Sequence, residues 1–255
     1  MREWFVNRLQ IPQRAVLNRK IPKKAFFTQA DLSTSEKEMF TSQIEGIYLL
    51  SVMNQQCMDI PIYQDDEFHY SEVVWIYIEL RMTTKNINRI IGAVHKSIPN
   101  PVVLIMASSE GRILLSTSHK RLNKNDKTKV VVEQPTMTDW FMPQEDDTVY
   151  SKLLNALVAS NLSFENLHCV YDDIHQWIRC EELIQLVGAI PSSSEKRDVA
   201  VSTLSNVQKY RKEVEQLQSE QKGQVDFGTK MDLHMKIKQQ EQQIQTQLQQ
   251  IKELC

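Results

Sequence analysis

Glu79 and Arg81 are the first residues of this sequence whose types and spacing suggest chemistry, because they stand at the end of a strongly apolar segment, residues 73–80. A strand-end carboxylate joined by a second carboxylate can hold a divalent cation, which activates water for phosphodiester cleavage. The preceding loop offers three aspartates for the second position, Asp59, Asp65 and Asp66. A nuclease site would then consist of Glu79, Asp66 and Arg81. The plainer alternative is a strand-end acid paired with a neighbouring base.

The order of elements around Glu79 resembles the core of the restriction-endonuclease-like fold, which implies a lysine at the position where this chain has Arg81. A guanidinium stays protonated, so it can stabilise negative charge but cannot act as a base. The residues therefore favour a degenerate nuclease site, used for binding, over an active one.

Metal and nucleotide sites of other kinds have little support. Zinc ligands would have to come from residues 168–180, namely His168, Cys169, His175 and Cys180. Their spacing spans two helical turns and lacks the compact ligand pairs of zinc fingers, so we expect no metal site. The chain has six glycines, none spaced as a phosphate-binding loop, and we expect no cofactor.

Positive charge is concentrated in two segments of a chain with a formal net charge of -2. The first thirty residues carry seven basic residues against Glu3, and residues 112–129 carry six against Asp126. If both segments lie on one face, they would contact phosphates nonspecifically through counterion release; a protein partner and plain solvated loops are the alternatives. The expected contact residues are Arg19, Lys20, Lys23, Lys24, Arg112, Lys120, Arg121 and Lys124.

The elements that must position these residues follow from apolar periodicity. Asp31 or Ser33 would cap a helix near 33–44, and a second amphipathic helix is expected at 86–98. Strands are expected at 47–53, 73–80, 102–107, 113–117 and 129–133. Helices follow at 149–159 and 171–187. The order predicts an α/β (α+β) fold with a mixed, largely antiparallel sheet packed by helices.

The last part of the chain is expected to form a separate arm. Pro191 begins a plausible hinge, so we divide the chain into an α/β domain, residues 1–190, and a glutamine-rich arm, residues 191–255. Apolar residues of the arm follow a heptad pattern that breaks between Gly223 and Gly228, which predicts a helical hairpin or a coiled coil. Glutamines weaken the seam, so a second surface is expected to complete it. Oligomerisation would then use Ile237, Ile244 and Ile251.

Several short motifs, in this order and spacing, resemble a family of prokaryotic proteins, the domain-of-unknown-function 4391 family, over approximately residues 5–220. The motifs are Lys20-Ile21-Pro22-Lys23-Lys24, Phe26-Phe27, Ala30-Asp31-Leu32, Ile78-Glu79-Leu80, Lys96-Ser97-Ile98-Pro99-Asn100-Pro101 and Ser118-His119-Lys120-Arg121. The resemblance implies a setting beside helicase-like ATPases and DNA methyltransferases in antiviral defence islands. It transfers no catalytic residues. Separately, the order of elements around Glu79 is similar to the core of the restriction-endonuclease-like fold.

These observations predict a non-catalytic accessory subunit of a bacterial antiviral defence complex. It would bind DNA, a helicase-type ATPase or a DNA methyltransferase subunit, and form oligomers through its arm. The alternatives are a metal-dependent nuclease, degenerate or active, and a regulatory module that acts without nucleic acid. No apolar run reaches the roughly 18 residues of a membrane span. Four cysteines without a CxxC pair favour a reducing cytoplasm.

Overall fold

The computed structural model describes residues 1–29, 32–81, 86–127, 129–146 and 148–255. They form two compact units, Met1–Glu181 (unit 1) and Glu182–Cys255 (unit 2, the arm). The predicted boundary at residue 190 lies beyond this division, because most of the short helix α8 (Glu181–Val187) groups with the arm. None of the described helices is long and apolar enough to cross a membrane.

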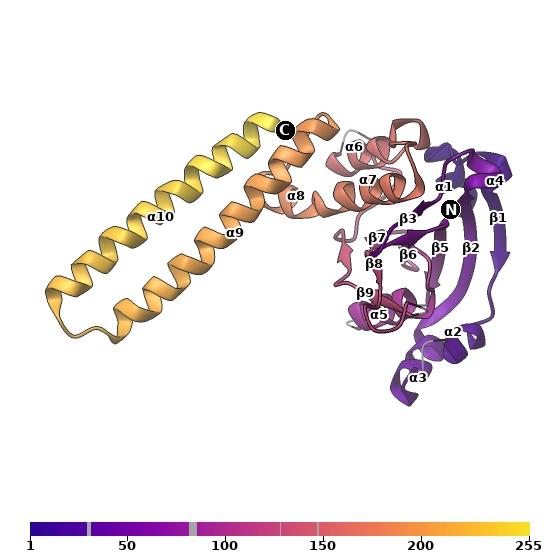
Figure 1. Ribbon diagram of the computed structural model, residues 1–255, viewed down its shortest axis with the longest axis horizontal. Helices are drawn as coiled ribbons and strands as arrows, with labels where there is room; N and C mark the ends of the chain where they lie inside the picture. Colours follow the sequence, from indigo (N-terminus) through magenta and orange to yellow (C-terminus); the bar gives the residue numbers. More distant parts are fainter. Residues whose placement is uncertain (30–31, 82–85, 128, 147) are drawn as a thin grey trace. The chain divides into compact units, whose positions relative to one another are not determined.

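Unit 1 is built on a six-stranded sheet in which every neighbouring pair is antiparallel except β5 and β6 (Figure 1). In spatial order the strands are β1 (Val16–Lys20), β2 (Ile44–Asn54), β5 (Glu72–Leu80), β6 (Val102–Ala107), β7 (Ile113–Thr117) and β10 (Thr136–Met137). This confirms the predicted fold class, a mixed and largely antiparallel sheet packed by helices.

Both faces of the central strands are covered by helices. The helices of unit 1 are α1 (Arg2–Arg8), α2 (Lys24–Gln29), α3 (Thr34–Gln43), α4 (Gln55–Met58), α5 (Ile87–Ser97), α6 (Val149–Ala156) and α7 (Leu167–Arg179), with 3-10 turns η1 (Gln13–Ala15) and η2 (Ala159–Asn161). Ile76 and Ile78 pack in one cluster with side chains of α2, α3 and α5. On the opposite face the ring of Tyr77 lies 6.2 Å from that of Phe5 in α1, and α7 also contacts the sheet.

Local sequence signals explain the helix boundaries. The Ser33 hydroxyl accepts a hydrogen bond from the Glu36 backbone N–H, and the Glu36 carboxylate accepts one from the Ser33 N–H at 2.8 Å. This reciprocal capping box begins α3, as the sequence predicts. Asp31, the other predicted cap, lies outside the described residues. The predicted helix at 86–98 is α5, which ends before the two prolines that precede β6.

Short strands depart from the sequence-based prediction. The loop before β5 holds α4 and a small hairpin of β3 (Tyr63–Gln64) and β4 (His69–Tyr70). The strand predicted at 129–133 is β9 (Val130–Val132), but it pairs with β8 (Lys120–Leu122) in a separate ladder. Instead, β10 joins the main sheet beside β7.

The arm is an antiparallel pair of long helices, α9 (Ser194–Gly223) and α10 (Phe227–Leu254), which lie side by side (Figure 1). Apolar residues at heptad spacing are buried along both helices: Val207, Val214, Leu233, Ile237, Ile244 and Ile251. Asp226 begins α10 as its N-cap and accepts a hydrogen bond from the Thr229 N–H at 2.7 Å. Of the two predicted forms of the arm, this is the hairpin.

Gly46 lies at a register shift between β2 and β5, and the ring of Tyr48 packs over it. A Cβ atom at position 46 would lie 2.7 Å from the Cε2 atom of Tyr48. The guanidinium carbon of Arg2 lies 3.6 Å from the centre of the same ring. A side chain at position 46 must therefore displace the Tyr48 ring and disturb its contact with Arg2.

We expect Gly46→Ala to lower the free energy of unfolding by about 1–3 kcal/mol, because the displaced ring must repack. Gly92→Ala is the control, since a Cβ atom there meets nothing within 4 Å and alanine favours the helix by up to about 1 kcal/mol. Urea unfolding measures both changes. If a Tyr48→Ala background does not reduce the cost of Gly46→Ala, the ring is not its cause.

Candidate functional site

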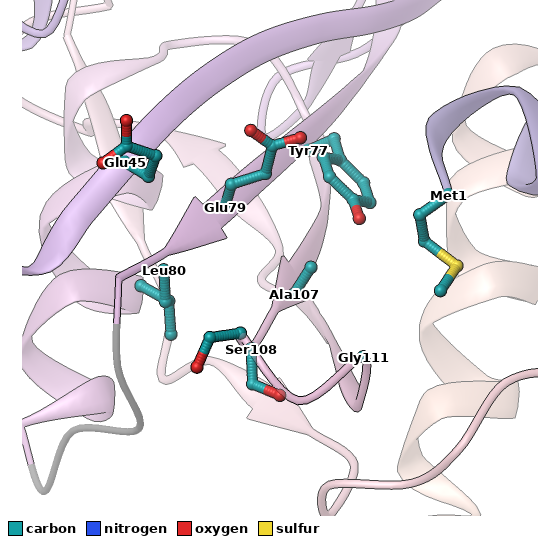
Figure 2. A pocket seen from close by; sticks show the side chains of 9 residues that line it. Met1, Glu45, Tyr77, Glu79, Leu80, Ala107, Ser108 and Gly111 are labelled. Atoms are coloured by element: carbon teal, nitrogen blue, oxygen red, sulfur yellow. The ribbon is translucent and has the colours of Figure 1, made fainter.

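Glu79 lies at the end of β5, at the rim of a pocket of about 270 Å³ (Figure 2). The other lining residues are Met1, Glu45, Tyr77, Leu80, Ala107, Ser108, Ser109 and Gly111. Glu79 and Tyr77 share one face of β5, and burial, with Glu79 adding to it, raises the pKa of Tyr77 to about 12. The Nε atom of Arg2 lies 3.6 Å from the Glu79 carboxylate. Glu79 is thus a strand-end acid with a basic neighbour, the plainer of the two predicted roles.

The structure does not assemble the predicted set of Glu79, Asp66 and Arg81. Asp66 lies in the β3–β4 hairpin, where it accepts a hydrogen bond from Lys127 Nζ at 2.9 Å. That hairpin lies before the start of β5, whereas Glu79 is near the end of the strand. The seven residues of β5 between its start and Glu79 span roughly 23 Å, which separates the two acids. The prediction that Asp66 joins Glu79 is therefore wrong.

Arg81 pairs with a different acid, Glu45, whose carboxylate lies 3.0 Å from the arginine Nε atom. Sequence reasoning missed Glu45 because it comes from β2, and only the antiparallel register of β2 with β5 brings it to the pocket. Within the described part of the chain, no group of three or more His, Cys, Asp or Glu residues is arranged to hold a metal ion.

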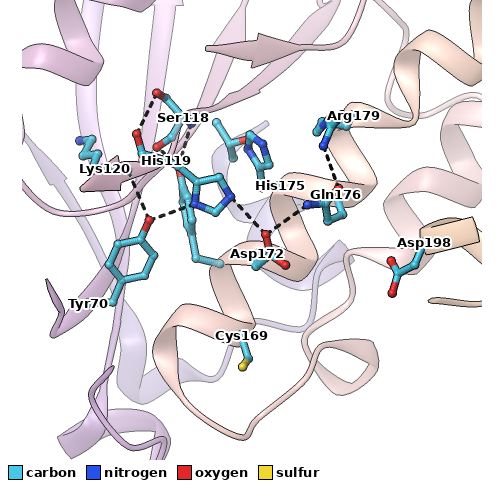
Figure 3. A network of polar contacts seen from close by, with 12 residues as sticks. Tyr70, Ser118, His119, Lys120, Cys169, Asp172, His175, Gln176, Arg179 and Asp198 are labelled. Atoms are coloured by element: carbon cyan, nitrogen blue, oxygen red, sulfur yellow. Dashed lines mark hydrogen bonds and ion pairs between the residues drawn. The ribbon is translucent and has the colours of Figure 1, made fainter. Parts of the chain in front are cut away.

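A second set of titratable side chains, the polar network, joins three elements of unit 1 (Figure 3). His119, in the link between β7 and β8, lies at its centre. Its Nδ1 atom is 3.1 Å from the Tyr70 hydroxyl of β4, and its Nε2 atom is 3.2 Å from the Asp172 carboxylate of α7. The ring of His175 lies 4.2 Å from that of His119, and the Nδ1 atom of His175 is 3.0 Å from the Thr117 hydroxyl.

The electrostatics of the polar network follow from burial and hydrogen bonding. The hydrogen bond from His119 is the main cause that lowers the pKa of Asp172 to about 2. Burial, with a contribution from His119, lowers the pKa of His175 to about 3, and burial also lowers the pKa of His168. The Tyr70 hydroxyl belongs to a fully buried side chain. These contacts of His119 with Tyr70 and Asp172 fasten α7 to the β-structure.

Lys120 is the largest departure from the predicted contact residues. Its side chain is buried, with the residue 2% exposed, and its ammonium donates hydrogen bonds to the carbonyl oxygens of Ile98 and, at 2.6 Å, Asn100. Burial lowers the pKa of Lys120 to about 7. Because DNA or a partner protein cannot reach this group, the structure removes Lys120 from the contact set.

The remaining cations of residues 112–129 lie at two ends of the sheet. Arg112 precedes β7, whereas Arg121 and Lys124 follow its end. Lys120 contacts Asn100, which lies just before β6, and the Leu122 N–H donates to the Glu67 carbonyl oxygen, which lies before β5. Residues 120–124 therefore lie at the opposite end of the sheet from Arg112. Arg121 also lies 3.6 Å from the Glu133 carboxylate. The cations of the second basic segment are therefore divided between the two ends of β7, and a common face with the N-terminal cations stays a prediction.

The N-terminal cations lie on the outer strand of the sheet. Arg19 and Lys20 are exposed on β1, which pairs on one side only, and Lys24 is exposed at the start of α2. No ion pair holds any of these three in the described residues, and we call them the cationic edge. Lys23 differs, because its ammonium donates hydrogen bonds to the carbonyl oxygens of Ile44 and Thr41.

Ile237, Ile244 and Ile251, the predicted oligomerisation residues, are all buried within this one chain. They belong to the apolar stripe of the α9–α10 hairpin, which the same chain closes. Because this one chain already buries all three, their contact with another copy stays a prediction.

Comparison with known proteins adds one finding. The family model described as Domain of unknown function (DUF4391) matches residues 9–244, nearly the whole chain. The chain belongs to the DUF4391 family. No curated protein and no solved structure matches it. Membership confirms the resemblance seen in the motifs, while the functional argument for this DUF4391 protein rests on its own surfaces.

The polar network predicts how the stability of this DUF4391 protein changes with pH. A histidine whose folded pKa is lowered binds a proton in the unfolded state first, so stability is lost as pH falls from about 6.5 towards 3. At pH 5 His175 alone would reduce the free energy of unfolding by roughly 2 kcal/mol relative to the value above pH 7. Replacement by a side chain that does not titrate removes this loss.

We therefore expect His175→Gln to be less stable than wild type at pH 7 but to lose less stability between pH 7 and pH 5. Urea unfolding followed by tryptophan fluorescence measures both slopes. His69→Gln, which changes an exposed histidine of the same unit, should keep the wild-type slope. Equal slopes for wild type and His175→Gln would contradict the assignment.

Proposed function

We propose that this protein is a non-catalytic accessory subunit of a bacterial antiviral defence complex, in which unit 1 contacts DNA and the arm engages a protein partner. The observation that carries the DNA contact is the cationic edge. Arg19, Lys20 and Lys24 are exposed and lack ion pairs in the described residues. Solvated cations of this kind are available to replace the counterions of phosphate groups.

The structural role of an edge strand does not account for all three cations. Charged side chains on an outer strand prevent it from pairing with another chain, and this explains Arg19 and Lys20. Lys24 lies beyond the strand in α2, where no strand edge has to be protected. The three together fit a strip of phosphate contacts.

The ring of Tyr48 lies beside the cationic edge. The Lys20 ammonium lies 5.9 Å from the centre of the Tyr48 ring, and Arg2 stacks on that ring at 3.6 Å. Arg2 also donates a hydrogen bond to Asn18 at 2.9 Å, so its position is fixed. The Tyr48 ring therefore restricts the Lys20 side chain before DNA binds, which lowers the conformational entropy that this side chain loses when it binds a phosphate.

We expect the triple variant Arg19→Ser/Lys20→Ser/Lys24→Ser to bind a labelled DNA duplex at least about tenfold more weakly at low salt. Loss of three phosphate contacts should also reduce the slope of log affinity against log salt by about 2–3. Fluorescence anisotropy measures both quantities, and circular dichroism checks that the variant is folded.

The matched control removes the same charge from the other basic segment, as Lys124→Ser/Lys127→Ser/Lys129→Ser. Lys127 and Lys129 are held by Asp66 and Asp126, so this variant should keep most of the wild-type affinity. DNA affinity that is absent from wild type, or equally reduced in both variants, would contradict the proposed contact.

The protein partner that we propose is a helicase-type ATPase, with a DNA methyltransferase subunit as the alternative. This part of the proposal rests on the setting that the family resemblance implies. Light scattering of the purified protein, alone and with a purified helicase-type ATPase from the same genome, tests the complex. A monomer whose mass is unchanged by the ATPase would count against it.

A further inference from the structure

The end of the arm exposes apolar side chains. Val225 is 95% exposed and Phe227 76%, and Met231 and Met235 follow at 49% and 64%. Phe227, Met231 and Met235 recur every fourth residue from the start of α10, so they lie on one face of the helix. We call these three residues the tip stripe.

The fold of the hairpin does not require the tip stripe. Asp226 caps α10 through a polar contact to Thr229, and Val225 precedes this cap. An apolar residue at this place commonly packs against the fourth residue of the helix, but that residue is Lys230. The buried positions of this part of α10 are Leu233 and Ile237, which lie outside the stripe.

The two flanks of the tip stripe differ in charge. At about 100° of rotation per residue, Lys230, His234 and Lys238 form a row on one flank, and all three are exposed. Gly228, Asp232 and Lys236 lie on the other flank, where the exposed acid and the exposed lysine offset each other. Lys238 contacts Glu241 at 2.7 Å, which leaves Lys230 as the main cation of the row. A partner that fits this surface carries carboxylates on one side.

A second copy of this chain does not have that chemistry. A two-fold antiparallel pairing of two tip stripes places each flank beside the same flank of the other copy. The row that holds Lys230 and Lys238 would then face the same row of the other copy, and like charges in contact disfavour the pairing.

A lipid bilayer is also a poor match. Asp226 stands between the two most exposed apolar residues, and hydrogen bonds, first of all from the Thr229 backbone, lower its pKa. A carboxylate that stays ionised at this position opposes insertion into hydrocarbon.

We propose that the tip stripe docks into an apolar groove of a protein partner, with partner carboxylates along the flank of Lys230 and His234. An amphipathic helix that presents anchors every third or fourth residue is a common way to fill such a groove. Methionine side chains adapt to irregular grooves, and phenylalanine supplies a rigid anchor. This inference rests on the proposed function, since it assigns the surface by which the accessory subunit holds its protein partner.

The test uses the full chain in its own host cells, with Phe227 replaced by the photoreactive residue p-benzoylphenylalanine. We expect irradiation to join this position to one protein. The same residue at Gln243, an exposed position of the same helix, is the control and should give no adduct. Mass spectrometry of the adduct identifies the partner and the segment that was reached.

The purified partner then tests the charge argument. Lys230→Glu/Lys238→Glu should weaken binding by about tenfold or more, and replacing the mapped partner carboxylates by lysine should restore it. An adduct between two copies of this chain, an adduct with lipid, no adduct, or a charge reversal without effect would overturn the proposal. The DNA affinity of these variants should equal that of wild type, so failure at the tip is distinguishable from failure of the cationic edge.

Discussion

The parallel pairing of β5 with β6 is the interaction on which unit 1 depends. Both strands are buried over almost their whole length, and a parallel pair needs a crossover over one face, here α5. The register sets Glu79 beside Ala107 at one end and Val74 beside Val102 at the other. Residues with charged or polar side chains are thereby divided between two ends of the sheet, which is why no single cluster gathers them.

Strong periodicity made the centre of the fold predictable. The strands near 73–80, 102–107 and 113–117 and the helix near 86–98 have apolar patterns long enough to fix their type. Strand β1 carries no such pattern, because four of its five residues are exposed on the outer edge. Strands β3, β4 and β10 have two residues each, so their pairing depends on tertiary contacts that a local pattern does not contain.

The candidate site was less predictable for the same reason. Charge counts identified the two basic segments but not which of their side chains are exposed. Lys23 and Lys120 instead donate hydrogen bonds to backbone carbonyl oxygens. His119 meets Tyr70 and Asp172 across separations of 49 and 53 residues, and no spacing motif marks such a contact. The heptad pattern of the arm, broken between Gly223 and Gly228, favoured a hairpin but did not show which surface completes its seam; the turn capped by Asp226 forms this hairpin.

The buried ammonium of Lys120 has a consequence for how the whole molecule meets a polyanion. The formal net charge of -2 counts this lysine as a cation, yet its positive charge is withheld from solvent. Burial also lowers the pKa of this lysine to about 7, so near neutral pH it carries only part of its positive charge and makes the net charge more negative than the formal value. A net negative charge repels nucleic acid at long range. DNA is therefore attracted only close to a local excess of cations, within about one Debye length of the protein surface, where salt does not screen their charge.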